Sequence, residues 1–526
     1  MNIRFMSSIC GIFMILFFCF EAIAKEEIRL IYGETAKISS YDSYTSHELA
    51  AQRLADLIYD SLIVLGPGAS YMPQLAKSWK ATKDNLSVEF ELREDVYWHS
   101  KLENKKFSAR DVVATVEAIL NRNSQIPSAE RFRVIKNAEI LGTNGVKINL
   151  HWPMYDPLSL LTFKILPADL LGEKPQLLRN SALAQHPVGT GSYEFDRATK
   201  SGEVYLRKNP RYYDSAPKID NLVLKMFTDK EIMSQALMFN SIDLVTSASP
   251  SRIAEIEADA NLKTHVYDSL SYSFIALNTK RSILSRKEVR QAINMAISRE
   301  EMLEAFFQNN GHLITGPFPP TSWAYNIDVK PYKYDALAAR AKLESQGLKD
   351  KDGDGYYEDQ TGKKINLSFL VPVSGESESV KKIVLAIKSY LKDVGLDCNV
   401  SFLDWNVWKE KVLANHDYDM ALGAWSFDDS SNITSLFHSS MAVEWGNNFT
   451  LFQNQEVDSL LAESSATFDL EKKRIINQKL HALISEEAPY VFLWSLKDHV
   501  AYTNKLSGFQ MRGQSIFNSI AKWKKM

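Results

Sequence analysis

The chain has 526 residues, of which 45% are hydrophobic and 24% charged, and its formal net charge at pH 7 is −3. This balance is typical of a globular protein and lacks the basic surplus of a nucleic-acid-binding protein. The length corresponds to about three domains. After residue 24 the only cysteine is Cys398, so we expect no disulfide within the mature chain and a fold stabilised by its core.

The first 24 residues have the pattern of a secretory signal peptide. Arg4 gives a positive region, an apolar run extends from Ile9 to Phe20, and Ala22-Ile-Ala24 is a small-residue cleavage site. The apolar run is shorter than the roughly 20 residues that a membrane-spanning helix needs. We therefore expect cleavage after Ala24 and export, and an uncleaved membrane anchor is the alternative.

The rest of the chain predicts strands and helices throughout. Alternating or apolar runs predict early strands at 28–32, 86–92, 146–150, 204–207, 222–226 and 271–278. Helical spacing predicts helices at about 47–60 and 231–239, and another one from Ser108 onward. In the last third, strands at 365–370 and 397–402 alternate with helices at about 335–346, 377–394, 455–467 and 470–487. This alternation predicts an α/β domain.

Residues 187–195 contain two glycines but lead into a strand rather than a helix. No Gly-Lys-Ser or Gly-Lys-Thr follows them, so they do not match a phosphate-binding loop. We interpret this segment as a tight turn that enters a strand.

The stretch from Tyr418 to Asp429 is the main candidate for a ligand-binding element. Two apolar sets alternate along it, as in a strand buried on both faces: Met420, Leu422 and Ala424, and Ala421, Gly423 and Trp425. The strand pattern ends at Ser426, and Asp428 and Asp429 follow. Ligands of open α/β sheets bind beyond the carboxyl ends of strands. A tryptophan followed by two acids at such an end suits an organic cation as the ligand. The alternative is a core tryptophan followed by a helix cap.

Seven short motifs follow one another along the chain: Leu75-Ala-Lys-Ser-Trp79; Phe90-Glu-Leu-Arg93 with Phe107-Ser-Ala-Arg-Asp-Val112; Pro187-Val-Gly-Thr-Gly-Ser-Tyr193; Arg207-Lys-Asn-Pro-Arg-Tyr-Tyr213; Asn278 with Val289-Arg-Gln-Ala-Ile-Asn-Met-Ala-Ile297; Tyr334-Asp-Ala-Leu-Ala-Ala339; and Ala424-Trp-Ser-Phe-Asp428. In this order they resemble the family 5 extracellular solute-binding proteins, which are the oligopeptide- and dipeptide-binding components of ABC importers. The resemblance covers nearly the whole chain after the signal peptide.

The resemblance implies an α/β fold of the periplasmic binding protein type (type II-like, with an extra inserted domain), with two lobes joined by a two-strand hinge. The ligand is then enclosed between the lobes, which close on binding. The implied divisions are a signal peptide at 1–24, lobe I at 25–64, 187–270 and 491–526, an inserted subdomain at 65–186, and lobe II at 271–490.

The resemblance also implies a ligand site. In peptide-binding members, the acid three residues after the tryptophan pairs with the α-ammonium group of the peptide, and here that acid is Asp428. Trp425 is then an apolar wall, and the further wall positions are Ser426, Asn278, Tyr272 and Tyr41. The alternative for Asn278 is a turn residue at the end of a strand. Leu422 stands where some peptide binders have an arginine, which leaves a nickel chelate, haem, a sugar or an opine as alternative ligands.

The function that follows is capture of small peptides in the periplasm and their delivery to an inner-membrane ABC permease. We expect a monomer that binds no nucleic acid, uses no cofactor and catalyses no reaction. A secreted hydrolase is the alternative from another class, although the chain has no Gly-x-Ser-x-Gly nucleophile motif.

Residues 350–358 match part of a calcium-binding loop. Asp350, Asp352 and Asp354 occupy its first, third and fifth positions, and Gly355 occupies the sixth. The twelfth position is Thr361, so the acid that binds calcium through both oxygens is missing there. The ten histidines are scattered without zinc-site spacing. We therefore expect no metal site and a plain hairpin at 350–358, with calcium binding as the alternative.

Overall fold

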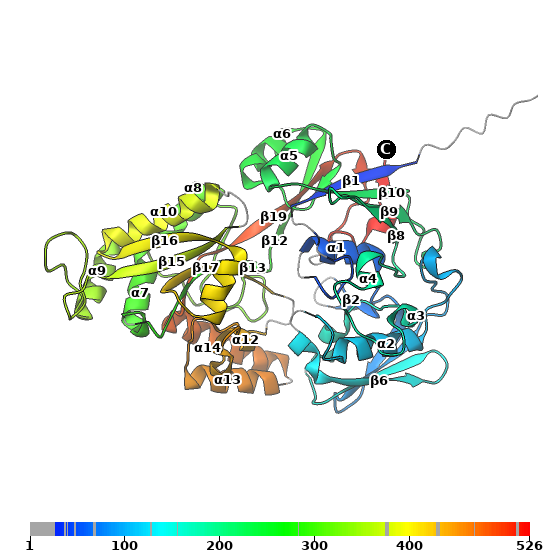
Figure 1. Cartoon of the computed structure of the whole chain (residues 1–526), viewed down its shortest axis with the longest axis horizontal. Helices are drawn as coiled ribbons and strands as arrows, with labels where there is room; N and C mark the ends of the chain where they lie inside the picture. Colours follow the sequence, from blue (N-terminus) through cyan, green and yellow to red (C-terminus); the bar gives the residue numbers. More distant parts are fainter. Residues whose placement is uncertain are drawn as a thin grey trace, which may run out of the picture.

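The structure is a computed structural model. It describes residues 27–526, apart from residues 36–37, 39, 47–48, 67–69, 127–128, 155, 282, 374–377, 428–431, 468 and 512–514. The predicted signal peptide lies outside the described residues. The molecule has two lobes side by side, and the strands labelled β12 and β19 run through the region between them (Figure 1).

The first lobe is built on an eight-stranded sheet. Seven strands follow one another across it: β12 (Leu262–Asp268), β19 (Trp494–Thr503), β11 (Leu244–Val245), β1 (Arg29–Glu34), β10 (Asn221–Met226), β9 (Val204–Lys208) and β8 (Tyr193–Ala198). The eighth strand, β14 (Gly311–Leu313), pairs with β19. β1 pairs in parallel with β10 and β11, and both β11 and β12 are antiparallel to β19. Consequently β1, β10, β11 and β12 all run in the same direction.

A four-stranded antiparallel sheet is inserted between β1 and β8. Its order is β4 (Ala76–Ala81), β5 (Ser87–Leu92), β7 (Gly145–Leu150) and β6 (Ile135–Leu141). Helix α2 (Ala109–Leu120) covers it and begins after Ser108, whose backbone N–H donates to the Asp111 carboxylate over 2.8 Å. The buried side chains of this sheet and those of the eight-stranded sheet, such as Val88 and Leu224, form one continuous apolar core.

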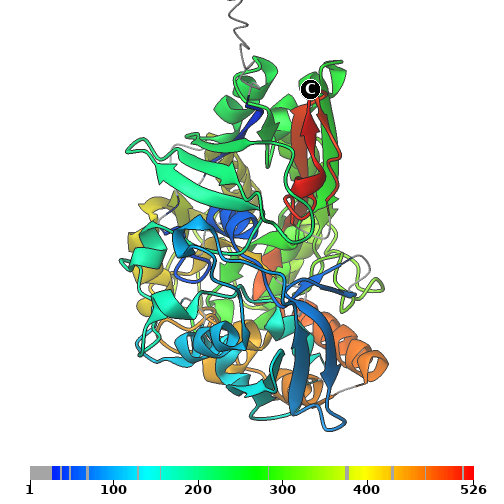
Figure 2. The same cartoon turned by 90° about the vertical axis from the view of Figure 1, so that its right-hand side faces the viewer.

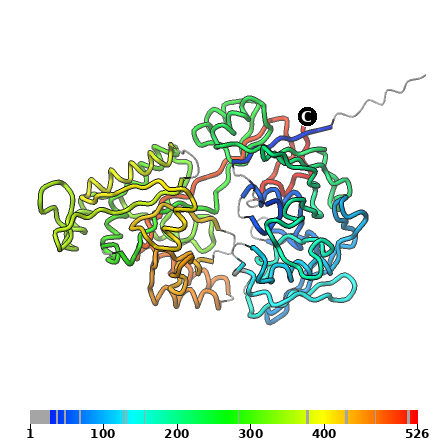
Figure 3. Tube along the Cα trace, viewed as in Figure 1, coloured from blue at the N-terminus to red at the C-terminus, as the bar shows by residue number. Residues whose placement is uncertain are grey.

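Both described ends of the chain belong to the first lobe. In Figure 3 the amino-terminal (blue) and carboxyl-terminal (red) segments lie together in the right-hand lobe. Trp523 is fully buried and packs against Phe509 and Phe517, which fixes the last segment to the core. The remaining elements of this lobe are β2 (Ile63–Leu65), β3 (Tyr71–Pro73), β20 (Leu506–Ser507), β21 (Lys524–Lys525), α1 (Leu49–Ile58), α3 (Ala168–Leu171), α4 (Ala182–Gln185), α5 (Lys230–Met238) and α6 (Ile253–Ala258).

The second lobe is built on a five-stranded mixed sheet. Its order is β16 (Asp397–Asp404), β15 (Asn366–Val373), β17 (Met420–Ser426), β13 (Ser271–Leu277) and β18 (Tyr490–Phe492). β15 is parallel to β16 and β17, and β13 is antiparallel to β17 and β18. The helices of this lobe are α7 (Lys287–Ala296), α8 (Arg299–Phe307), α9 (Ala336–Ser345), α10 (Glu378–Asp393), α11 (Trp405–Lys409), α12 (Thr434–Phe437), α13 (Gln455–Ala466) and α14 (Leu470–Glu487).

Helices cover both faces of the five-stranded sheet, as the apolar pattern of β17 predicts. Met420 and Leu422 pack in a core with α7, α8 and α10, whereas Ala421 and Trp425 pack in a second core with α12, α13 and α14. The two-faced burial is therefore confirmed for the first half of β17, whereas Ala424, which was predicted to be apolar and covered, is exposed near the end of the strand. The sheet itself is mixed, because β13 and β18 join it in the antiparallel sense.

The chain passes between the two sheets twice. It leaves β12 at Asp268 and enters β13 at Ser271, and it leaves β18 at Phe492 and enters β19 at Trp494. The two passages lie side by side, since β12 pairs with β19 along its whole length, as the turned view in Figure 2 also shows. The Ser495 hydroxyl donates to the Ser269 carbonyl over 3.2 Å and ties them together. The predicted α/β architecture of two lobes and a two-strand hinge is confirmed.

Candidate functional site

The edge of the first sheet that faces the hinge carries the carboxyl ends of its parallel strands. β12 runs in the same direction as β1, β10 and β11, and its carboxyl end continues into the second lobe. The carboxyl ends of β1 and β11, at Glu34 and Val245, therefore point toward the second lobe. Ligands of α/β sheets bind at this kind of edge.

The second sheet presents the equivalent edge. β13 starts at Ser271 directly after the hinge, and the antiparallel strand β17 ends opposite it, with Ser426 paired to Ser271. β15 and β16 are parallel to β17, so their carboxyl ends, Val373 and Asp404, lie along the same edge. The carboxyl ends of parallel strands thus face each other across the hinge.

Trp425 and Ser426 lie at this edge of the second lobe. Trp425 is half-buried, its ring stacks on Phe274 at 5.8 Å, and its Nε1 donates to the Tyr490 hydroxyl over 3.2 Å. Phe274 also covers Gly423, where a Cβ would come within 2.8 Å of the ring. Ser426 is exposed at the end of the strand. Both predicted wall residues thus lie at the hinge-facing edge of the second lobe.

Tyr272 and Asn278 lie deeper in the second lobe. Tyr272 is 1% exposed, and its hydroxyl donates to the Pro317 carbonyl over 3.1 Å. Asn278 is 2% exposed, and its Nδ2 lies 3.1 Å from the carbonyl oxygens of both His416 and Tyr418. Asn278 therefore fastens the far end of β13 to the start of β17, which is the strand-end role left open by the sequence.

Tyr41 and Asp428 complete the predicted set. Tyr41 follows β1 in the first lobe, is half-buried, and packs its ring against Phe195 at 5.3 Å. Burial raises the pKa of Tyr41. Asp428 and Asp429 lie outside the described residues, two and three positions beyond the end of β17. The assignment of these residues to a ligand site stays a prediction.

A buried ion pair occupies the facing edge of the first lobe. Arg53 on α1 donates through Nη1 to both carboxylate oxygens of Glu34, over 3.0 and 2.9 Å, and the Thr246 hydroxyl donates to Glu34 over 2.9 Å. Burial acts to lower the pKa of Arg53, but the carboxylate of Glu34 and further acidic groups outweigh it and raise that pKa. Arg53 therefore keeps its charge in a nearly enclosed position.

The ion pair continues into the hinge through Tyr267 on β12 and Asp498 on β19. Burial raises the pKa of Tyr267 to about 12, Asp498 adds to the rise, and Arg53 opposes it. Asp498 accepts from the Ser247 hydroxyl over 2.6 Å and pairs with Lys230 at 3.6 Å. No sequence motif indicated this network, because its members come from distant segments that only the sheet brings together.

A charge of the inserted segment also acts on α14 of the second lobe, on the side away from β12 and β19. Lys473 on α14 of the second lobe is half-buried, and burial lowers its pKa, while Asp156 of the inserted segment opposes that shift. Asp156 itself caps a 3₁₀ turn of the inserted segment. Charges of the two lobes therefore interact on this side as well as at the hinge.

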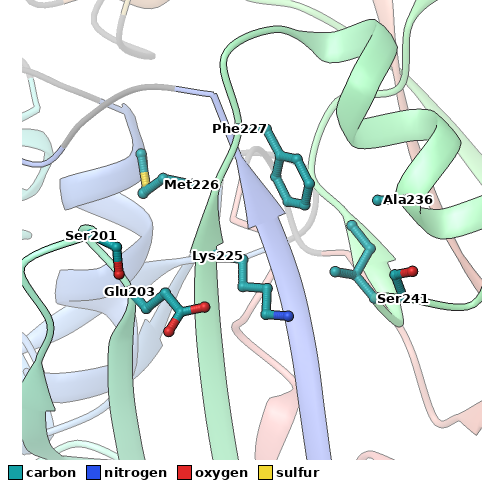
Figure 4. Close-up of a pocket in the computed structure, with 8 residues that line it drawn as sticks. Ser201, Glu203, Lys225, Met226, Phe227, Ala236 and Ser241 are labelled. Atoms are coloured by element: carbon teal, nitrogen blue, oxygen red, sulfur yellow. The ribbon is translucent and has the colours of Figure 1, made fainter.

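A shallow pocket of about 230 Å³ lies within the first lobe and not between the lobes (Figure 4). Side chains from the β8–β9 hairpin, the end of β10 and the region of α5 line it: Ser201, Glu203, Lys225, Met226, Phe227, Ala236, Ser241 and Ile242. It is separate from Trp425 and Ser426, and its open, mixed lining does not form an enclosed site.

Two α/β lobes that are joined by two strands and present strand carboxyl ends across the hinge define the class of two-lobed solute-binding proteins. The family model described as "Bacterial extracellular solute-binding proteins, family 5 Middle" matches residues 70–445. The chain belongs to this family, which confirms the resemblance seen in its motifs.

Relatives and solved structures agree with this assignment. The oligopeptide-binding protein AppA of Bacillus subtilis is 25% identical over 502 residues, covering 94% of this chain and 91% of AppA. Its structure with a nonapeptide has a TM-score of 0.82 at 24% identity and covers 95% of this chain and 99% of that one. NikZ from Campylobacter jejuni in complex with Ni(L-His) has a TM-score of 0.82 at 26% identity, covering 94% and 99%.

A further relative is the probable di/tripeptide-binding protein 5 of Pseudomonas aeruginosa. It is 25% identical over 506 residues, which cover 92% of this chain and 93% of the relative. The family is one of extracellular solute-binding proteins and not of enzymes. Among the described residues, no helix combines the length and apolarity needed to cross a bilayer.

Proposed function

We propose that the mature protein captures small peptides between its two lobes in the periplasm and delivers them to an ABC permease of the inner membrane. The observation that carries this proposal is the pair of opposed edges, with Trp425 and Ser426 at the end of β17 and Glu34 with Arg53 at the end of β1. The protein acts as a monomer after loss of its signal peptide and performs no chemical step.

Asp428 is the proposed partner of the peptide's α-ammonium group. It follows the exposed end of β17 by two residues and Trp425 by three. A charged amine enclosed between lobes needs a carboxylate, because an unpaired buried charge costs several kcal/mol. The basic partner Arg53 in the opposite wall is already held by Glu34, so we assign no ligand carboxylate to it.

Peptides suit this site because main-chain groups can be recognised regardless of side chain. The half-buried Trp425 ring offers an apolar wall, while exposed Ser426 offers a hydroxyl and a strand end. Support comes from the relatives: AppA is named oligopeptide-binding and was solved with a nonapeptide, and the Pseudomonas relative is named di/tripeptide-binding.

The test compares free and amino-terminally acetylated peptides of the same sequence by calorimetric titration. Free peptides should bind, and acetylated ones should bind weakly. Asp428→Asn should lower the affinity for free peptides by more than about tenfold, because it removes one member of an enclosed charge pair. The matched control is Asp393→Asn, an exposed acid at the end of α10, which should bind like the wild type. Equal affinity of wild type and Asp428→Asn removes Asp428 from the site.

The second candidate is the same scaffold with a metal chelate as ligand. It is favoured by the likeness to NikZ, which was solved with Ni(L-His), and by Leu422, which packs against the core of the second lobe and brings no charge to β17. Native mass spectrometry of the purified protein distinguishes the candidates, since a co-purified peptide and a nickel chelate differ in mass and isotope pattern. Turnover of a peptide library would instead support a hydrolase.

A further inference from the structure

The loop between α9 and β15 gathers acidic side chains far from the hinge. Figure 1 places it at the left-hand end of the molecule, beyond α9 and on the side opposite the first lobe. Its neck is closed by the backbone of Lys349 and Glu358, where the Glu358 N–H donates to the Lys349 carbonyl over 2.9 Å. The loop is thus a closed element of the second lobe with no part in the interlobe site.

Four carboxylates converge inside this loop. One oxygen from each of Asp350, Asp352, Asp354 and Glu358 lies within 4.8 Å of the other three. Backbone N–H groups of the loop fix the first of these acids, since Gly353 donates to one oxygen of Asp350 over 2.7 Å and Gly355 donates to the other over 2.9 Å. Four like charges held this close repel one another unless a cation lies between them.

Glu358 supplies the observation that separates this cluster from an ordinary acidic turn. Its side chain is 4% exposed, and its Oε1 is buried without a hydrogen-bond partner among the described residues. Its Oε2 accepts from the Lys351 backbone N–H over 2.7 Å. A buried carboxylate oxygen without a partner loses its hydration and gains nothing in return, which is rare in folded proteins. A bound cation supplies the missing partner.

We propose that this loop binds one divalent cation of the calcium type through Asp350, Asp352, Asp354 and Glu358. All four donors are hard carboxylate oxygens, which suit calcium, and main-chain carbonyls or water can complete the six to eight ligands that it takes. Lys364 pairs with one oxygen of Asp354 at 2.9 Å, and the other oxygen accepts from the Tyr356 backbone N–H over 2.9 Å and keeps a second lone pair for the ion. The calcium-loop pattern expects an acid at the twelfth loop position, where this chain has Thr361. In the structure the fourth carboxylate comes instead from Glu358, at the ninth position.

The cation would tie the neck of the loop to its tip, because Glu358 lies at the neck and Asp352 at the exposed turn. Binding therefore stabilises the second lobe locally. Since the loop lies at the end of the lobe remote from β17, the ion leaves capture of the transported solute unchanged.

The test uses the full mature protein, stripped with EDTA and titrated with CaCl₂ by calorimetry. We expect one equivalent of calcium to bind and to raise the melting temperature, because a ligand that binds only the folded state stabilises it. Asp352→Asn, at an exposed position, and Glu358→Gln should each lower calcium affinity by about tenfold or more, since affinity follows the number of charged ligands.

The matched control is Asp359→Asn, which removes one negative charge next to the cluster without removing a ligand. Asp359 accepts from the backbone N–H groups of Thr361 and Lys363, and an asparagine oxygen can keep both bonds. This variant should bind calcium like the wild type. The proposal is overturned if millimolar CaCl₂ neither binds nor shifts the melting temperature, or if Asp352→Asn and Asp359→Asn bind calcium equally.

Discussion

At the scale of single residues, His481 on α14 shows how burial sets charge. The ring has no exposed surface, its Nε2 lies 2.8 Å from the Thr315 hydroxyl, and its Nδ1 has no partner among the described residues. Burial lowers the pKa of His481 to about 3. The folded protein therefore keeps this imidazole neutral at pH values where the unfolded chain protonates it.

This difference predicts acid sensitivity of the second lobe. The unfolded chain takes up a proton near pH 6.5, so the free energy of unfolding falls as the pH drops from 7 toward 3, by about 2 kcal/mol at pH 5 from this residue alone. Melting temperatures at pH 7 and pH 5 measure the effect. His481→Gln should reduce the difference between the two melting temperatures. His151→Gln, at an exposed position, should leave that difference as in the wild type. If His481→Gln loses as much melting temperature between pH 7 and pH 5 as the wild type, buried neutral His481 is not the cause of the acid sensitivity.

The residues of the candidate site were only partly predictable. Trp425 and Ser426 could be found because a strand pattern ends at them, and the structure places both at the hinge-facing edge. The burial of Tyr272 and Asn278 depends on which elements cover β13, and a single strand pattern does not carry that information. Arg53 and Glu34 come from different elements, α1 and β1, and no local spacing marks them as a pair.

At the scale of elements, the sequence predicts those strands in which each face keeps the same surroundings, core or solvent, along most of the strand. β5 and β7 keep a regular apolar pattern along their length, and β17 keeps one until it nears the hinge. β12 and β19 do not, because they leave the covered sheet and run through the polar hinge, where Asp268, Lys497 and Asp498 replace apolar residues. Their pairing follows from tertiary structure rather than from alternation.

The turn at residues 187–193 enters β8 as predicted, and its glycines allow close contact with α1. A Cβ at Gly189 would lie 1.9 Å from the Ile58 carbonyl oxygen, while the Gly191 N–H donates to that same oxygen over 2.9 Å. A side chain there must displace backbone at the end of α1.

We therefore expect Gly189→Ala to destabilise the first lobe by about 3 kcal/mol or more, since the clash is with backbone that cannot rotate away. Chemical denaturation followed by circular dichroism measures the loss. The control is Gly172→Ala, where no atom lies within 4 Å of an added Cβ and the cost is limited to backbone strain at φ 75°. Equal stability of Gly189→Ala and wild type would contradict the close contact.

At the scale of the whole molecule, the hinge is the element that permits movement. The two passages between the sheets are short and paired, with Asp268 opposite Lys497, so the lobes can rotate about them as rigid bodies. A ligand that contacts both edges favours the closed arrangement by its extra affinity for that arrangement.

We predict that a peptide ligand lowers the radius of gyration measured by small-angle X-ray scattering and raises the melting temperature. The Asp428→Asn variant, at the same peptide concentration, should give a smaller change in both. Binding that leaves the radius of gyration unaltered would show that the lobes do not close around the ligand.

The order of strands along the hinge has a consequence for how the gene can be divided. The chain enters the second lobe through β13 and leaves it through β18. These two strands are adjacent, with Phe274 opposite Phe492. Near the two ends of segment 271–493, the chain entering the lobe and the chain leaving it therefore lie about one strand spacing apart, roughly 4.8 Å. It can be exchanged between homologous genes as one cassette with two junctions, whereas the first lobe is assembled from separate stretches of the reading frame. Recombination can thus replace the wall that carries Trp425 and leave the Glu34–Arg53 wall untouched.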